Sequence, residues 1–215
     1  MIGIVDYGMG NLYSLSQALR RLDVPYLISG ETEQLQRADG LILPGVGAFK
    51  DAMGALRAQQ LVTFLHGYAT TKPLLGICLG MQLLFDESEE GGLTSGLSLL
   101  PGRIIRFPQQ DAEGTLLKVP HMGWNTLTFH QSSPLLNGLD PDYVYFVHSY
   151  YASTRTADSI LATASYGVDV PAIVGRGNVF GTQFHPEKSS VFGERLLQNY
   201  VSFVSQNKQS REARA

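Results

Sequence analysis

The segment GICLG (76–80) places Cys78, the only cysteine of the 215-residue chain, between two glycines. A G-x-nucleophile-x-G pattern is typical of a sharp strand-to-helix turn that exposes a reactive side chain. The apolar run PLLGI (73–77) predicts the strand, and LGMQLLFD (79–86) predicts the helix. The glycines would relieve crowding where the helix passes the strand, and the helix N-terminus would favour the thiolate form of Cys78. A lone thiol is more often a small buried hydrophobe, so this chemistry requires a partner base.

His185 has the neighbours that such a base needs. It follows the apolar run VFGTQF (179–184), and Pro186 after it favours an extended backbone and disfavours a helix start. In an extended chain residues i and i+2 project to the same side, so Glu187 would orient the imidazole of His185. The other ring nitrogen would then face Cys78. A cysteine–histidine–glutamate triad is therefore predicted.

The other histidines predict no second site. His66 lies in an apolar helical pattern and His130 at a strand end, which favours surface or core roles. His121 and His148 lie on separate segments, and the chain has neither HxxxH nor HExxH, so we expect no metal site. One cysteine cannot form an internal disulfide or a CxxC pair. No cofactor is expected.

A thiolate that attacks a carbonyl also needs donors for the developing oxyanion. The N–H of Leu79, directly after the nucleophile, is one candidate. The segment LPGVG (43–47) offers a second at Val46, because glycines on both sides let the backbone approach a substrate closely. Taken by itself, PGVG is also the sequence of an ordinary turn.

The surrounding elements predict an α/β fold. Short apolar runs alternate with helical patterns in the first half, which is typical of a mostly parallel, doubly wound sheet with flanking helices. The predicted strands there are residues 2–5, 25–28, 40–43 and 73–77, and residues 12–22 form an amphipathic helix. An additional, mainly β second half is predicted from apolar runs at 103–107, 124–129, 143–151, 160–165, 172–176 and 179–184.

One domain over residues 1–206 accounts for these elements, with a final helix over 191–205 that packs back on the sheet. The polar tail 207–215 is expected to be frayed. The stretch QQDAEGT (109–115) is expected to form a hairpin loop.

Composition limits the function classes. Hydrophobic residues make up 44% of the chain and charged residues 16%, which is typical of a globular protein and not of a disordered one. The formal net charge of -3 gives no support to a nucleic-acid surface. Without a leader-like start or an apolar run of about 18 residues, we expect no membrane association and a cytoplasmic location.

Six segments together resemble the class I glutamine amidotransferases, and more narrowly the glutaminase subunits of imidazole glycerol phosphate synthase in histidine biosynthesis. They are IVDYGMGNLYSL, LPGVGAFKDAM, GICLGMQLLFDES, KVPHMGWN, YFVHSYY and GTQFHPEKS, and they span nearly the whole chain. The resemblance implies that Cys78 is the nucleophile, His185 the general base and acid, and Glu187 the residue that orients His185. It also implies glutamine contacts from Gly47, Gln82, Ser149 and Tyr150, and partner contacts from Asn11, Met122, Trp124 and Lys188.

The same resemblance implies a partner subunit. Free ammonia would mostly become unreactive ammonium at neutral pH, so a (β/α)8-barrel cyclase is expected to receive it in a heterodimer. Trp124 could equally be ordinary core, since GWNTLTF reads as a strand start. The stretch 91–102 is longer and more polar than the family pattern and is expected to form a surface loop.

Two other functions compete with this interpretation. The same triad could serve a hydrolase that cleaves γ-glutamyl compounds or peptides without a partner. Alternatively, YGMGN (7–11) could be a phosphate-binding loop of a nucleotide-binding module. That match is poor, because the third glycine of the fingerprint would fall at Tyr13.

Overall fold

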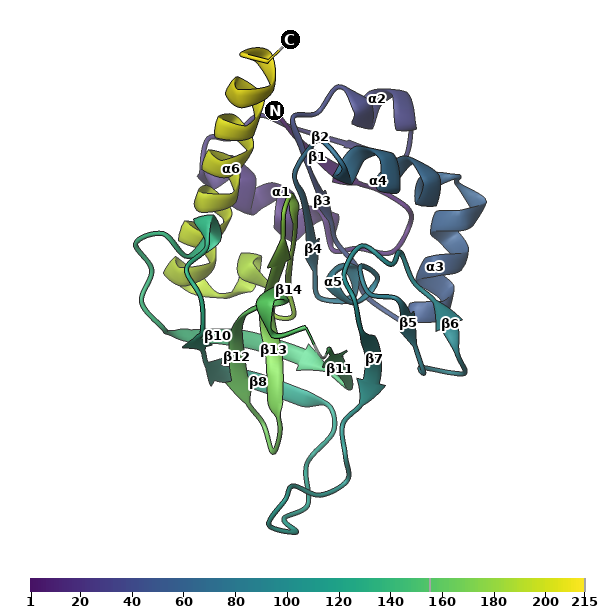
Figure 1. Ribbon diagram of the computed structural model, residues 1–215, viewed down its shortest axis with the longest axis vertical. Helices are drawn as coiled ribbons and strands as arrows, with labels where there is room; N and C mark the ends of the chain where they lie inside the picture. The colour runs from purple at the N-terminus through teal and green to yellow at the C-terminus, as the bar shows by residue number, and fades with distance from the viewer. Residues whose placement is uncertain (155, 215) are drawn as a thin grey trace.

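A large sheet forms the centre of the protein in the computed structural model, which describes residues 1–154 and 156–214 (Figure 1). Its eight strands lie in the order β2-β1-β3-β4-β14-β13-β12-β9. The pairings from β2 to β14 are parallel and those from β14 to β9 are antiparallel. The bounds are β1 (Ile2–Val5), β2 (Tyr26–Ser29), β3 (Gly40–Leu43), β4 (Leu74–Ile77), β9 (Thr128–Phe129), β12 (Ile160–Ser165), β13 (Asp169–Arg176) and β14 (Val179–Thr182).

Helices cover both faces of this sheet, which confirms the predicted doubly wound α/β fold. In Figure 1, α1 (Leu12–Arg21) and α6 (Ser190–Glu212) lie on the left, whereas α2 (Thr32–Gln36), α3 (Phe49–Ala58) and α4 (Leu61–Ala69) lie on the right. Each face has its own core, because successive strand side chains point to opposite sides. None of the helices in the described ranges has the length and apolarity needed to cross a bilayer.

Two smaller sheets carry the rest of the β structure. One pairs β8 (His121–Thr126) with β10 (Tyr143–His148), and the other has the order β11 (Tyr150–Ser153), β7 (Arg103–Arg106), β5 (Glu87–Ser88), β6 (Thr94–Ser95). In the described residues there are also three short 3-10 helices, namely η1 (Pro134–Leu136), η2 (Ala157–Ser159) and η3 (Pro186–Lys188).

Two predicted strands are each divided between sheets. The run 143–151 changes sheet at Ser149, whose carbonyl accepts a hydrogen bond from the N–H of Phe107 next to β7. The run 124–129 divides at Leu127, which is buried and whose N–H bonds to the carbonyl of Asp142. An apolar run shows that a segment is buried but not where it leaves one sheet for another, so the sequence could not place these breaks.

The helix after Cys78 is shorter than predicted. α5 is the single turn Leu79–Gln82, because the next carbonyls accept hydrogen bonds from another segment. Those of Leu83, Leu84 and Phe85 accept from N–H groups of residues 97–100. The stretch 91–102 is consequently not only a surface loop, since it contains β6, and Leu97 and Leu100 in it are 0% and 1% exposed.

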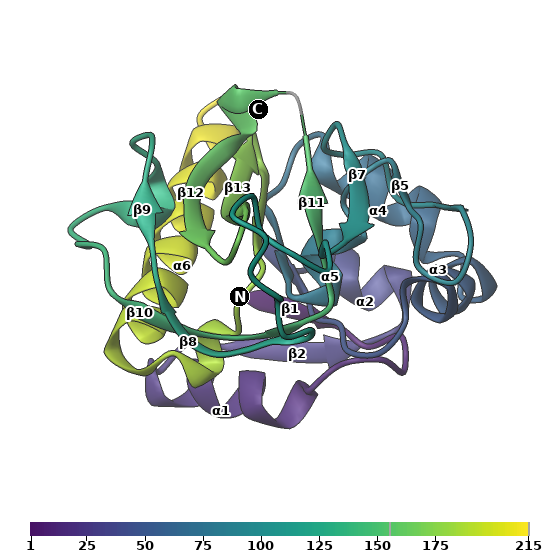
Figure 2. The ribbon, with the colours of Figure 1, turned by 90° about the horizontal axis from the view of Figure 1, so that it is seen from below.

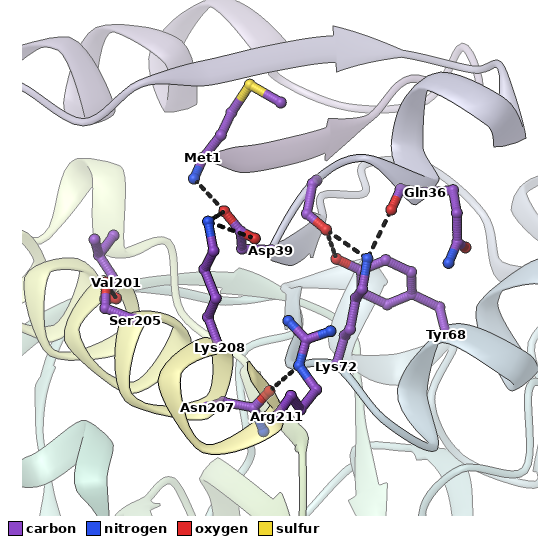
Figure 3. Close-up of polar contacts among 11 residues, drawn as sticks. Met1, Gln36, Asp39, Tyr68, Lys72, Val201, Ser205, Asn207, Lys208 and Arg211 are labelled. Atoms are coloured by element: carbon purple, nitrogen blue, oxygen red, sulfur yellow. Dashed lines mark hydrogen bonds and ion pairs between the residues drawn. The ribbon is translucent and has the colours of Figure 1, made fainter. Parts of the chain in front are cut away.

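The last helix is longer than predicted, and the expected domain end at 206 falls inside it. Residues 207–212, predicted to fray, are helical. Lys208 pairs with Asp39 at 3.4 Å, and Asn207 donates a hydrogen bond to Asn178 at 3.1 Å. Figure 3 shows Lys208 and Arg211 reaching from α6 towards Asp39 and Lys72. The apolar residues of the predicted helix end before residue 206, and beyond that point these polar contacts hold the last turns of α6 against the sheet.

The predicted hairpin loop at 109–115 is confirmed. The N–H of Asp111 donates to the carbonyl of Thr115 at 3.0 Å, and the N–H of Leu117 donates to the carbonyl of Gln109 at 2.9 Å. An antiparallel bridge also pairs Gln110 with Leu116.

Candidate active site

The carboxyl ends of neighbouring strands bring the predicted residues together. Val46 follows β3, Cys78 follows β4, and His185 follows β14, and these three strands are adjacent in the sheet. In open α/β sheets this edge is where ligands bind. All three residues line one cavity of about 350 Å³.

Cys78 occupies the strained turn that the sequence predicts. Its backbone has φ 55° and ψ −113°, a conformation that side-chain-bearing residues rarely adopt. The N–H of Cys78 donates to the carbonyl of Thr182 at 2.8 Å and so fixes the turn to β14. Cys78 is 7% exposed and lines the cavity.

The two glycines around Cys78 are required by close backbone approach. A Cβ atom at Gly76 would lie 2.5 Å from the carbonyl oxygen of Gly80, and one at Gly80 would lie 1.9 Å from that of Leu43. Neither neighbour can move away without breaking the elbow, because both are backbone atoms. The spacing of GICLG therefore reflects the geometry that presents the thiol.

His185 and Glu187 are in contact, although not for the predicted reason. The carboxylate Oε1 of Glu187 accepts a hydrogen bond from Nδ1 of His185 at 2.8 Å, and the two side chains are 3% and 4% exposed. His185 itself is extended as expected, with φ −95° and ψ 100°, but the chain does not stay extended to Glu187. Pro186 instead begins the 3-10 turn η3, where its missing N–H costs nothing. The turn brings Glu187 back to the ring of His185.

Charge stabilises the protonated form of His185. Burial by itself lowers the pKa of this imidazole, but hydrogen bonds with Cys78 and Glu187, together with their negative charges, outweigh it. The net effect raises the pKa of His185 above its ordinary value. The arrangement therefore favours an imidazolium at His185 that is oriented by a carboxylate and lies beside the sulfur of Cys78.

The loop 43–47 approaches the elbow through Gly45. A Cβ atom there would lie 2.7 Å from the backbone N of Gly80 and 2.8 Å from the hydroxyl of Tyr7. That hydroxyl donates to the carbonyl of Pro44 at 2.9 Å. Val46 is 43% exposed, and Gly47 has φ 101°, so the loop turns its backbone over the cavity beside Cys78.

The predicted glutamine contacts Gly47, Gln82, Ser149 and Tyr150 line the same cavity. Gln82 is 5% exposed, and its Nε2 donates to the carbonyl of Tyr150 at 2.9 Å and to Oε1 of Gln183 at 3.0 Å. Ser149 and Tyr150 follow β10 and reach the cavity at the point where the chain changes sheet. Gln82 thus ties the elbow to the Ser149–Tyr150 backbone.

The four predicted partner residues lie outside the cavity. Met122 and Trp124 on β8 are 60% and 53% exposed, so the alternative of a core position for Trp124 is wrong. Lys188 is exposed in η3, and Asn11 is half-buried as the N-cap of α1, where its Oδ1 accepts from the N–H of Ser14. η3 contacts both α1 and β10, and Figure 2 shows β8 and β10 on the same side of the molecule as α1.

The segment 7–11 does not have the environment of a phosphate loop. A Cβ atom at Gly10 would lie 2.9 Å from the ring of Pro44, so this glycine allows two loops to pack. The N–H of Gly8 donates to the Asp6 carboxylate at 3.1 Å.

His66 and His130 are exposed, and no group of three or more potential metal-ligating side chains occurs in residues 1–154 and 156–214.

Several residues near Cys78 were missed by the sequence analysis. Tyr7 is 2% exposed, and burial together with the charge of Cys78 raises its pKa above the ordinary value. Glu90 and His148 line the cavity, and Gln183 contacts Gln82. His148 stands in the segment YFVHSYY, but only pairing with β8 shows that its ring points inward.

Comparison with known proteins places the chain. The model of the family described as glutamine amidotransferase class-I matches residues 3–202. The subunit HisH of imidazole glycerol phosphate synthase from Geobacillus thermodenitrificans is 60% identical over 206 residues, which are 95% of this chain and 97% of that one. The protein of the same name from Halalkalibacterium halodurans is 57% identical over 213 residues, covering 98% and 100% of the two chains.

Solved structures share the fold at low identity. A glutamine amidotransferase of known crystal structure superposes with a TM-score of 0.73 at 20% identity, covering 95% of this chain and 98% of the other. PurLQS from Thermotoga maritima gives 0.67 at 20% identity, with 94% and 98% coverage. These likenesses concern the fold alone.

Proposed function

The chain belongs to the class I glutamine amidotransferase family, and from this premise we propose that Cys78, His185 and Glu187 are the triad with which it hydrolyses glutamine. The identity to HisH proteins over nearly the full chain makes it the glutaminase subunit of imidazole glycerol phosphate synthase. The observation that carries the proposed triad is that His185, hydrogen-bonded to Glu187, lines the same cavity as the strained Cys78 elbow.

The proposed reaction proceeds through a thioester. The thiolate of Cys78 attacks the side-chain amide carbon of glutamine, and protonated His185 transfers its proton to the departing nitrogen, which leaves as ammonia. His185 then removes a proton from water, which attacks the thioester and releases glutamate and the thiolate. Glu187 accepts the Nδ1–H of His185 throughout and so keeps its Nε2 directed at the reacting atoms.

Backbone donors support both tetrahedral intermediates. Leu79 is the first residue of α5, so its N–H has no intrahelical acceptor, and Leu79 lines the cavity. Val46 would supply the second N–H from the loop that Gly45 brings close to the elbow. Gly47, Gln82, Ser149 and Tyr150 would hold the rest of the substrate.

The relatives are named as subunits, and we propose a (β/α)8-barrel cyclase as the partner that receives the ammonia. The exposed Met122 and Trp124, with Lys188 and Asn11, would form the contact surface. A cytoplasmic location agrees with a nucleophile that must remain a reduced thiol.

The test is the nitrogen source of the reconstituted pair. Cys78→Ala should abolish formation of imidazole glycerol phosphate from glutamine and leave formation from ammonium salt intact. The substitution is small, so its stability cost should stay within about 0.5–3 kcal/mol and the complex should assemble. Equal loss of both activities in an intact complex would refute the division of labour between the subunits. Steady glutamine hydrolysis by the isolated chain that never forms a complex would instead favour a free-standing hydrolase.

A further inference from the structure

Two buried histidines that the triad does not use connect β8 with the cavity. Nδ1 of His121 lies 3.0 Å from Nε2 of His148, and Nδ1 of His148 lies 2.8 Å from the carbonyl oxygen of Tyr150. Nε2 of His121 lies 3.3 Å from Nδ2 of Asn125. The side chains therefore form one hydrogen-bond chain from Asn125 to the Tyr150 carbonyl.

The proton positions in this chain are fixed from the Asn125 end. Oδ1 of Asn125 accepts from the N–H of Thr126 at 2.8 Å, and Nδ2 donates to the carbonyl of Ser165 at 2.9 Å. The amide nitrogen therefore faces His121, and Nε2 of His121 must accept. The proton of a neutral His121 is then on Nδ1, which donates to His148.

The other end requires the same arrangement independently. The carbonyl of Tyr150 can only accept, so the proton of His148 is on Nδ1 and its Nε2 accepts from His121. Both ends thus select the Nδ1–H tautomer for both rings. An added proton on Nε2 of His148 would face the N–H of His121, and an added proton on Nε2 of His121 would face the N–H of Asn125.

Packing holds both rings in this neutral state. His121 is stacked between Tyr166 at 4.0 Å and Phe146 at 4.6 Å, measured between ring centroids. Burial lowers the pKa of His121 to about 4. Burial lowers the pKa of His148 to about 3, because it outweighs the opposing hydrogen bond to Tyr150, and His121 and His185 lower it slightly further.

The chain ends on a carbonyl that a second donor also binds. The carbonyl oxygen of Tyr150 accepts one hydrogen bond from Gln82 and one from His148. These two bonds use both lone pairs of the oxygen. The peptide after Tyr150 cannot rotate without breaking both bonds.

We propose that His121 and His148 act as a neutral positioning pair that fixes the Ser149–Tyr150 backbone for binding the amino and carboxylate groups of glutamine. This inference rests on the proposed function. Neither histidine is assigned a proton-transfer step, and the pair acts through the carbonyl of Tyr150.

Two substitutions of His148 separate positioning from packing. The amide nitrogen of asparagine in His148→Asn falls near the position of Nδ1 and can still donate to Tyr150, whereas His148→Leu fills more of the space but removes the donor. In the complex with the partner subunit, we expect KM for glutamine to rise about three- to tenfold in His148→Leu and to change less than about twofold in His148→Asn. We expect kcat to stay within about threefold in both, because the triad is untouched. His130→Leu, which removes a histidine bond to Thr163 elsewhere, is the matched control and should leave KM unchanged.

The order of the variants decides the result. A purely packing role predicts that KM follows thermal stability, with the smaller asparagine worse than leucine, and that order would overturn the positioning pair. An unchanged KM in His148→Leu would also overturn it while leaving the proposed function standing. A wild-type complex that does not hydrolyse glutamine would refute the proposed function and this inference with it. If His148→Leu does not fold, ¹⁵N NMR of the wild-type rings gives the answer, since an Nε2–H tautomer or an imidazolium at His148 near pH 7 would contradict the chain.

Discussion

Replacing Glu187 by glutamine removes a buried charge and keeps the shape of the side chain. In the wild type the carboxylate lies 2.8 Å from His185 Nδ1, with both side chains at most 4% exposed, so solvent screens the pair little. Opposite charges centred about 4 Å apart attract by ~4 kcal/mol at an effective dielectric of ~20. At ~1.4 kcal/mol per tenfold, the loss predicts a fall in kcat of about three orders of magnitude, within a range of about ten to ten thousand.

The same substitution should leave KM nearly unchanged and shift the pH profile. Glu187 does not line the cavity, so glutamine binding does not depend on it directly. The carboxylate is one of the groups that raise the pKa of His185, so Glu187→Gln lowers that pKa and the imidazolium loses its proton at a lower pH. The basic limb of kcat/KM should therefore move to lower pH.

Steady-state glutamine hydrolysis by the complex, measured across pH, checks both expectations. Glu194→Gln is the matched control, because Glu194 pairs with Arg21 on the surface of α6, where such pairs contribute about 0–1 kcal/mol. That variant should keep kcat within about twofold. If Glu187→Gln does the same, Glu187 is a structural carboxylate and the mechanism reduces to a Cys78–His185 dyad.

Two further predictions concern the elbow and the partner surface. Gly80→Ala should lower Tm by more than about 10 °C in a thermal melt, since the new Cβ would overlap backbone. Gly54→Ala, at an exposed position of α3 with nothing within 4 Å, should be neutral or stabilising, and equal melting temperatures of the two variants would contradict the close approach at Gly80. Trp124→Ala should weaken binding to the cyclase about 10- to 100-fold, measured by calorimetry, and should leave Tm unchanged. The control is Leu93→Ala, because Leu93 is 68% exposed between β5 and β6, and this variant should bind as the wild type does. Equal affinities of the two variants would remove Trp124 from the interface.

The elbow and the contact between His185 and Glu187 could be predicted because local sequence determines both. GICLG fixes a backbone conformation within five residues, and the clashes at Gly76 and Gly80 are the physical content of that pattern. The contact of His185 with Glu187 is also local, so it was predicted correctly even though the backbone between them turns where an extended chain was expected.

The features that the sequence did not predict depend on segments far apart in the chain. α5 ends after one turn because residues 97–100 bond to its following carbonyls, and no pattern within LGMQLLFD shows that competition. The His121–His148 pair needs the antiparallel register of β8 with β10, because the two residues are separated by 27 positions in the sequence. Tyr7 reaches the site only because β1 lies next to β3 in the sheet.

Strand β8 serves two surfaces at once, and its register determines both. Met122 and Trp124 point outward, while His121 and Asn125 point inward into the hydrogen-bond chain. Pairing with β10 sets His121 opposite His148, from which the chain continues to Tyr150. A slip of one residue would reverse every side chain of β8, burying Trp124 and exposing His121. The pairing of β8 with β10 therefore specifies both the surface proposed for the partner and the histidine pair proposed to position the Ser149–Tyr150 backbone. A slip in this pairing would disrupt both features together.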